Sequence, residues 1–172
     1  MTLARRLAAL SPVALLACGS KPTDTRDSAA EEPPTVDELV CLQTSEGGIE
    51  MTPGPAAAST APAMLEINVP YTIVLNAQRG GWIRVPLTAG EYQLWIGADE
   101  VISGMVFGTA PAAPPEPTPN SACPTEIPAQ FTFTVAQDQD VFFSVKPSIT
   151  PRAWVMITEV DSFGQAAGAT GG

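Results

Sequence analysis

Carboxylates are the residues best placed to do chemistry, because the chain of 172 residues contains 18 Asp and Glu and no histidine. They come close together in sequence at Asp99-Glu100 and at Asp138-Gln139-Asp140. Two acids can hydrolyse a glycoside when they face each other across roughly 5 to 10 Å. Neighbouring residues of one turn have no reason to adopt that geometry. We therefore expect solvated turn residues, with a carboxylate-based hydrolase as the alternative.

A metal site is the second use of these acids. Carboxylates in a turn supply the hard oxygen ligands that Ca²⁺ prefers, which makes Asp138 and Asp140 a calcium candidate. The stretch lacks the third oxygen ligand and the glycine of a DxDxDG loop. The nucleophile elbow GxSxG and the phosphate loops GxxxxGK[ST] and GxGxxG are also missing from the sequence. We expect no metal, no cofactor and no catalysis.

The amino-terminal segment has the pattern of an export signal. A basic start, Met1 to Arg6, precedes an apolar run from Leu7 to Ala17 that is interrupted at Ser11-Pro12. A helix of that run would rise about 16 Å, roughly half of the ~30 Å core of a bilayer. The run is too short to span a membrane, and it predicts a secretory signal peptide over residues 1–17.

Leu15-Leu16-Ala17-Cys18 resembles the lipobox of bacterial lipoproteins. In that family a diacylglycerol is attached to the cysteine, the peptide is cut just before it, and the new amino terminus is usually acylated. The resemblance implies lipidation of Cys18 and a membrane partner through the lipid anchor. Gly19, where Asp would favour the inner membrane, favours the outer membrane of a bacterial envelope, on its periplasmic or surface face. An ordinary signal peptide with an incidental cysteine is the alternative.

The expected mature chain, residues 18–172, is long enough for one domain with a hydrophobic core. Without Arg5 and Arg6 it carries six basic residues against eighteen acidic ones, a net charge near −12. Such a chain is repelled by nucleic acid and by anionic lipid surfaces. We exclude nucleic acid as a partner.

Two further cysteines, Cys41 and Cys123, remain once Cys18 carries lipid. An even pair in an exported protein predicts a disulfide. Metal binding is the alternative, but neither thiol belongs to a CxxC motif and histidine ligands are missing.

Composition and periodicity divide the chain. We expect a flexible lipidated tether over 18–35, a domain over 36–161 and a flexible tail over 162–172. Residues 36–40 predict a short turn or helix, Pro53–Pro62 a surface loop, and 110–120 an exposed Pro-rich insert. Apolar residues alternate with polar ones from Met64 onward, which predicts seven or eight short strands. The inward rows are Leu65-Ile67-Val69, Tyr71-Ile73-Leu75, Ile83-Val85-Leu87, Tyr92-Leu94-Ile96, Phe131-Phe133-Val135 and Val141-Phe143-Val145, with further strands over Val101–Phe107 and Trp154–Val160.

These strands predict an all-β protein, a single antiparallel β-sandwich with a jelly-roll-like arrangement. WIRVPLTAGEYQLWI and FTFTVAQDQDVFFSV each give a strand, a tight polar turn and a strand. The pattern over Tyr71 to Val160 is similar to the pre-peptidase C-terminal type of bacterial sandwich domain, and departs from it in the Pro-rich insert and the cysteine pair. The resemblance bears on fold alone.

Trp82 and Trp95 are the candidate ligand-binding residues. If their strands form a hairpin across the turn at Gly90, both indoles lie on one outer face, with Arg84 and Gln93 nearby. Exposed aromatic platforms hold sugar rings in many carbohydrate-binding modules. The alternative is that the segment around Cys41 covers the tryptophans. We expect a lipid-anchored, non-catalytic binding or structural module, with an envelope protein or a glycan as possible partners.

Overall fold

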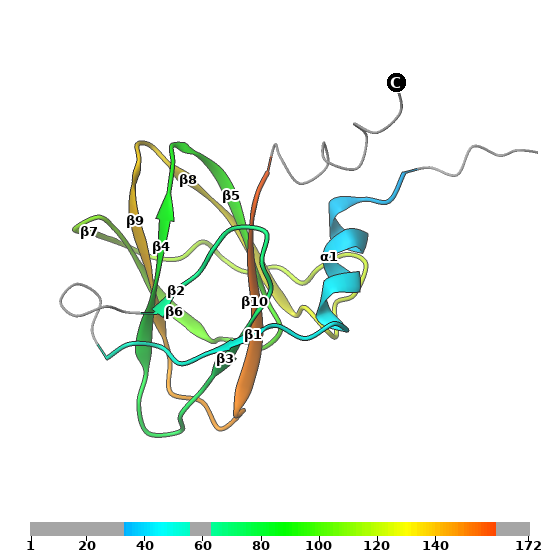
Figure 1. Ribbon diagram of the computed structural model, residues 1–172, viewed down its shortest axis with the longest axis horizontal. Coiled ribbons are helices and arrows are strands. Elements are labelled where there is room, and N and C mark those ends of the chain that lie inside the picture. The colour runs from blue at the N-terminus through cyan, green and yellow to red at the C-terminus, as the bar shows by residue number, and fades with distance from the viewer. Residues whose placement is uncertain (1–32, 56–62, 161–172) are drawn as a thin grey trace, which may run out of the picture. The chain divides into compact units, whose positions relative to one another are not determined.

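Two five-stranded sheets pack face to face in the computed structural model (Figure 1). The structure describes residues 33–55 and 63–160. The predicted signal peptide, Cys18, most of the tether and the tail 162–172 lie outside these residues. Within the described ranges, no helix has the length and apolar character needed to cross a bilayer.

The strand order is β1-β3-β10-β5-β8 in the first sheet and β2-β4-β9-β6-β7 in the second. The first sheet consists of β1 (Ile49–Met51), β3 (Tyr71–Val74), β10 (Arg152–Glu159), β5 (Gly90–Ile96) and β8 (Ala129–Val135). The second consists of β2 (Ala63–Met64), β4 (Gly81–Leu87), β9 (Gln139–Val145), β6 (Ile102–Phe107) and β7 (Ala110–Ala112). Neighbours are antiparallel except for the parallel pairs β1–β3 and β2–β4.

The connectivity is that of a jelly roll, because the chain passes repeatedly from one sheet to the other. Four strands of the first sheet, in the order β3-β10-β5-β8, face four strands of the second, in the order β4-β9-β6-β7. Strands that follow each other in sequence therefore lie in opposite sheets, as β3 and β4, β5 and β6, and β8 and β9 do. The predicted antiparallel sandwich is confirmed. Seven strands have four residues or more, and the remaining three, β1, β2 and β7, are short strands at sheet edges that alternation could not reveal.

Five of the six predicted inward rows, together with Leu65 of the sixth, form the core between the sheets. Alternate residues of β4, β5, β8 and β9 are buried there, including Val85, Leu94, Phe133 and Phe143. Phe133 lies at the centre of an aromatic cluster, with its ring centroid 5.9 Å from that of Tyr92 and 5.6 Å from that of Phe143. The spacing of two residues places each apolar row on one face of its strand, and this face is the one that the opposite sheet covers.

The hairpin across the turn at Gly90, on which the tryptophan platform depended, does not form. β4 pairs with β9 and β5 pairs with β10 and β8, so the connection through Thr88 and Ala89 carries the chain between sheets. The connection from β8 to β9 does the same. We call each of these two connections, between strands in opposite sheets, an arch. The strands on either side of an arch each carry an apolar row. Because the strands lie in opposite sheets, the two rows face each other across the core, whereas in a hairpin they would lie side by side in one sheet.

Two further predictions need correction. Of the strand expected after Met64, only Ala63–Met64 pairs; the chain then turns through Asn68, whose φ is +62°, and Ile67 is 37% exposed. The Pro-rich insert is largely exposed as expected, but Asn120 is buried. Ala110–Ala112 of it form β7 at a sheet edge, where Pro111 is tolerated although it lacks an N–H. Thr118 also exchanges two hydrogen bonds with Gln130, at 2.9 and 2.7 Å.

The short element predicted at residues 36–40 is a helix, α1 (Val36–Thr44), which continues past Cys41. A capping box starts it: the backbone N–H of Glu38 donates to Thr35 Oγ1 at 3.3 Å, and that of Thr35 donates to Glu38 Oε2 at 2.7 Å. Val40 on α1 packs with Trp95, Ile127 and Met156 in a second apolar cluster. α1 thus covers part of the outer face of the first sheet (Figure 1).

Cys41 and Cys123 form the predicted disulfide, with their Cα atoms 6.0 Å apart and a sequence separation of 82. It joins α1 to the loop before β8. The buried side chain of Asn120 shapes that loop by accepting hydrogen bonds from the backbone N–H groups of Ala122 and Cys123, at 2.8 and 2.9 Å. Asp37 adds a second link, because Oδ2 accepts from both the N–H and the hydroxyl of Ser121.

Candidate ligand-binding cleft

The two predicted platform tryptophans lie on different sheets. Trp95, on β5, is fully buried in the cluster under α1, and its Nε1 donates to Thr158 Oγ1 at 3.0 Å. Trp82, on β4, is half-buried on the outer face of the second sheet. The predicted aromatic platform is therefore wrong, and the alternative, that the segment around Cys41 covers the indoles, holds for Trp95. Gln93 lies on the first sheet with Trp95, away from Arg84.

Arg84 is held by a carboxylate on the second sheet. Its Nη1 lies 3.5 Å from Asp140 Oδ2, and the two side chains are 30% and 39% exposed. Phe142, which is opposite Arg84 in the β4–β9 register, is buried. What remains of the predicted binding set is a half-buried pair, Trp82 and Arg84, two residues apart on one strand.

Asp138, Asp140 and Glu100 make contacts within the domain. Asp138 Oδ1 accepts a hydrogen bond from the backbone N–H of Ala89 at 2.9 Å, which ties the β8–β9 arch to the β4–β5 arch. Asp140 contacts Arg84, and Glu100 lies 3.6 Å from Lys146 Nζ. Within residues 33–55 and 63–160, no three Asp, Glu or Cys side chains gather as a metal site would need. These contacts favour a structural role for Asp138 and Asp140 over calcium binding.

A cleft that the sequence did not predict lies at one end of the sandwich. After β1, the segment Thr52–Pro55 crosses from the first sheet to the second, where Gly54 exchanges two hydrogen bonds of 2.8 Å with Trp82. Gly81 permits this approach, because a Cβ at that position would lie 2.5 Å from the Cβ of Pro53. The crossing segment and the β3–β4 turn form the two walls of the cleft.

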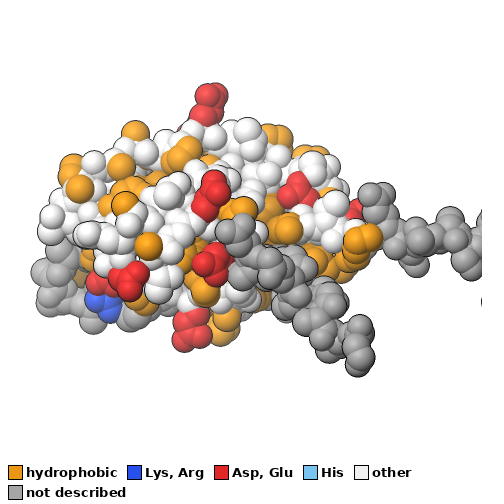
Figure 2. Space-filling model, turned by 90° about the horizontal axis from the view of Figure 1, so that it is seen from above, with side chains coloured by type: hydrophobic (Ala, Val, Ile, Leu, Met, Phe, Trp, Pro, Cys, Tyr) orange, Lys and Arg blue, Asp and Glu red, His pale blue; other side chains and the backbone are white. Residues whose placement is uncertain are grey.

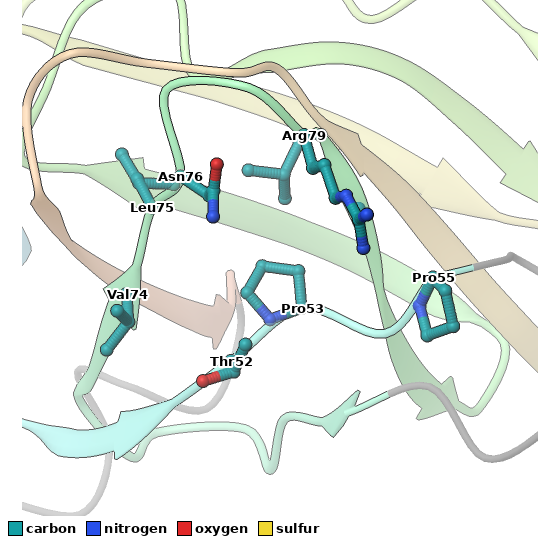
Figure 3. Close-up of a pocket in the computed structure, with 10 residues that line it drawn as sticks. Thr52, Pro53, Pro55, Val74, Leu75, Asn76 and Arg79 are labelled. Carbon is teal, nitrogen blue, oxygen red and sulfur yellow. The ribbon is translucent and has the colours of Figure 1, made fainter.

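The cleft has a volume of about 550 Å³, within the usual range for small-ligand sites. Five apolar side chains line it: Pro53, Pro55, Val74, Leu75 and Val145. Thr52, Asn76 and Arg79 are the polar side chains of the lining. Figure 3 shows Arg79 reaching from the β3–β4 turn toward Pro53 and Pro55, with the Asn76 amide between the walls.

Arg79 differs from the other cations that the structure describes. Arg84, Lys146 and Arg152 lie 3.5, 3.6 and 2.8 Å from Asp140, Glu100 and Glu50. Over the same described ranges, Arg79 has no carboxylate within 4.0 Å, although the chain carries a net charge of −10. The cleft therefore has one exposed guanidinium with which none of the described acids pairs.

The neighbouring amide and hydroxyl complete the polar side of the cleft. Asn76 Oδ1 accepts from the backbone N–H of Gln78 at 2.8 Å, which fixes the amide and leaves its nitrogen directed toward Pro53 (Figure 3). Thr52 contributes an exposed hydroxyl from the opposite wall. A signal for this site does exist in the sequence: Arg79 stands in the turn QRGG, the one basic residue between Arg26 and Arg84 of an acidic chain.

Asp138, in the β8–β9 connection, and Asp140, in β9, border a separate open depression of about 460 Å³ beside the β4–β5 connection. Figure 2 shows acidic side chains scattered over one face of the molecule, with basic side chains scarce. No known family model matches this chain, and no curated protein matches its sequence.

Proposed function

We propose that this chain is a lipid-anchored protein of a bacterial cell envelope that acts as a non-catalytic binding module, with the end cleft as its binding site. The observation that carries the proposal is the cleft itself. Apolar walls with a few convergent polar groups are typical of small-ligand sites. The walls come from β3, β4 and the crossing segment, which backbone hydrogen bonds hold in place.

The chemistry of the lining supports binding over catalysis. Arg79 is the ionisable side chain among the described residues that line the cleft, and a guanidinium stays protonated in proteins. It can orient and neutralise an anion, but it cannot serve as a general base. The hydrolase alternative needs two acids facing each other across a cleft. Asp138 instead accepts from the backbone N–H of Ala89, and Asp140 pairs with Arg84.

The anchor half of the proposal rests on the lipobox-like residues Leu15–Cys18. Two acyl chains hold a protein stably on a membrane, whereas one chain is marginal. A tether of about twenty flexible residues would reach roughly 25 Å from the bilayer. That reach would present the domain to an envelope ligand while α1, at the start of the domain, stays fixed by its disulfide.

Anchoring is tested by expressing the full chain with and without Cys18→Ser, with growth on an alkyne-tagged fatty acid. The wild-type protein should take up label and sediment with membranes, while the variant should be unlabelled and soluble. An unlabelled wild-type protein would exclude the anchor and leave the binding proposal standing.

Binding is tested by capturing small molecules from an envelope extract on the mature Cys18→Ser protein. Thr52→Trp places an indole at the mouth of the cleft and should abolish the capture. Thr109→Trp adds the same ring at an exposed turn outside the cleft and should leave the capture unchanged. Equal capture by both variants would refute the cleft as the binding site.

A glycan site on the second sheet is a second candidate, because Trp82 stays partly accessible beside Arg84. Glycans that bind there should change the tryptophan fluorescence of the wild-type protein and not that of Trp82→Phe. Unchanged fluorescence across a glycan panel would count against it.

A further inference from the structure

The cleft provides hydrogen-bond donors and one positive charge, and this composition selects its ligand. The guanidinium of Arg79, the amide nitrogen of Asn76 and the hydroxyl of Thr52 can all donate. The amide oxygen of Asn76 is already used by Gln78 N–H. A group that accepts several hydrogen bonds and carries negative charge would match these donors.

The charge of the ligand is limited by the rest of the protein. The chain has a net charge of −10, so a polyanion would gain one local attraction and meet general repulsion. A ligand with a single negative charge keeps the attraction to Arg79 at the smallest electrostatic cost. This argument favours a monoanion over nucleic acid or a multiply charged phosphate.

The shape of the charged group follows from the guanidinium. Arginine presents two parallel N–H donors in a plane, and a carboxylate accepts both in a bidentate pair. The other three described cations already lie within 4.0 Å of carboxylates of this protein, so Arg79 is the described cation that can take a carboxylate from outside.

The apolar walls determine what the carboxylate is attached to. Pro53 and Pro55 lie near the guanidinium in Figure 3, and Leu75 and Val145 are buried at the inner side. Apolar surface removed from water contributes about 25 cal/mol per Å². A ligand with an apolar body next to its carboxylate can therefore use both halves of the cleft.

We infer that the cleft binds a small organic monocarboxylate, with the carboxylate paired to Arg79 on the side of the cleft that Asn76 lines, and the apolar body against Pro53, Pro55 and Leu75. This inference rests on the proposed function, because it takes the cleft as the binding site. A free acid, an acidic sugar and the carboxyl end of a short peptide share the required chemistry.

The experiment titrates acids and their neutral amides into ¹⁵N-labelled mature Cys18→Ser protein. The probes are 3-phenylpropionate, N-acetylalanine and glucuronate, each with its amide, which separates the three sources. At least one acid should shift the Gly80 and Gly81 amide resonances saturably at roughly millimolar concentration. Its amide should bind about tenfold more weakly, because it loses a charge-assisted pair.

Variants of the cation provide the matched control. Arg79→Gln should weaken binding of the acid about tenfold, and Arg79→Lys should weaken it less because the charge is kept without the planar fork. Lys146→Gln makes the same change in net charge, but its side chain pairs with Glu100 and does not line the cleft, so acid affinity should be unchanged. Arg79 is exposed, and its substitution should leave the melting temperature unchanged.

Three outcomes would overturn the inference. Acids and amides of equal affinity at the cleft would refute the carboxylate and leave the binding function intact. Unchanged acid affinity in Arg79→Gln would do the same. If no probe acid shifts the glycine resonances, the carboxylate inference fails, and the Thr52→Trp capture experiment then decides separately whether the cleft binds anything.

Discussion

The outer faces of the two sheets each carry a tryptophan, but they differ in how far that side chain is buried. Each presents a tryptophan that points away from the core: Trp95 on the first sheet and Trp82 on the second. Trp95 is fully buried under α1 with Val40, Ile127 and Met156, whereas Trp82 stays partly exposed beside Arg84. Strand alternation places both side chains outward. Whether an outward side chain is buried depends on an element from another part of the chain.

The cover of the first sheet is built from two distant segments. α1 brings Val40, and the loop before β8 brings Ile127; the Cys41–Cys123 disulfide and the Asp37–Ser121 contacts join them. In Figure 1, α1 lies beside the first sheet, next to β10. This arrangement buries part of the outer face of the first sheet in a second apolar cluster. The following variants test the difference between the two outer faces.

Truncation of the two tryptophans should give the largest difference. Trp95→Ala empties a buried site and leaves Thr158 without its partner, so the free energy of unfolding should fall by about 3–5 kcal/mol. Trp82→Ala should cost no more than about 1 kcal/mol, because the side chain is half-buried. Denaturant unfolding measures both, and equal costs would contradict the contrast between the faces.

Removal of the disulfide should come next. Cys41→Ala combined with Cys123→Ala frees the unfolded chain of a crosslink that closes a long loop, and we expect a loss of about 2–4 kcal/mol. Acrylamide should also quench tryptophan fluorescence more strongly, because α1 no longer shields Trp95 as well. The reduced wild-type protein is the control and should match the double variant. A stability equal to that of the oxidised protein would show that packing alone holds α1.

Loss of the buried hydrogen bond between Trp95 and Thr158 should lower the free energy of unfolding by a smaller amount. Thr158→Val keeps the volume of the side chain but removes the acceptor of Trp95 Nε1, which should cost about 1–3 kcal/mol. Thr132→Val, on the exposed side of β8, is the matched control and should change stability little. Thermal unfolding compares the two, and similar midpoints would mean that the Trp95 hydrogen bond adds nothing.

The helix cap should give the smallest effect. Thr35→Ala removes the side-chain oxygen that accepts from Glu38 N–H, at a cost of about 1 kcal/mol. Thr35→Ser keeps that oxygen and should retain most of the stability. Hydrogen exchange of the first turn of α1 is the direct measurement. Exchange in Thr35→Ala that matches Thr35→Ser would show that the capping box does not order the helix.

The sequence predicted which residues of each strand are buried better than it predicted which strands pair. Ile83, Val85 and Leu87 alternate strictly, and this local pattern alone determines that one face of the strand is buried. The partner of that strand is not a local property: β4 pairs with β9, more than fifty residues later, in place of β5 after a two-residue connection. A tight polar turn looks the same whether it closes a hairpin or crosses the core.

The candidate site was missed for a related reason. Its walls come from the Thr52–Pro55 crossing segment and the β3–β4 turn, and they meet because β1 and β2 join opposite sheets. Low-complexity sequence around Pro53 and Pro55 predicted a surface loop and nothing more. The cysteine pair, by contrast, was predictable, since pairing is nearly forced once only two thiols remain.

The disulfide also decides what happens when the chain is cut. Cys41 and Cys123 close a covalent ring that contains β1 to β7 and the exposed Pro-rich segment before Cys123, whereas β8, β9 and β10 lie outside it. A protease that cuts one peptide bond inside this ring produces two fragments that remain one molecule, and they separate on a gel only after reduction. Whatever precedes α1 then stays joined to the last three strands, so a single nick does not release the domain from its amino-terminal segment.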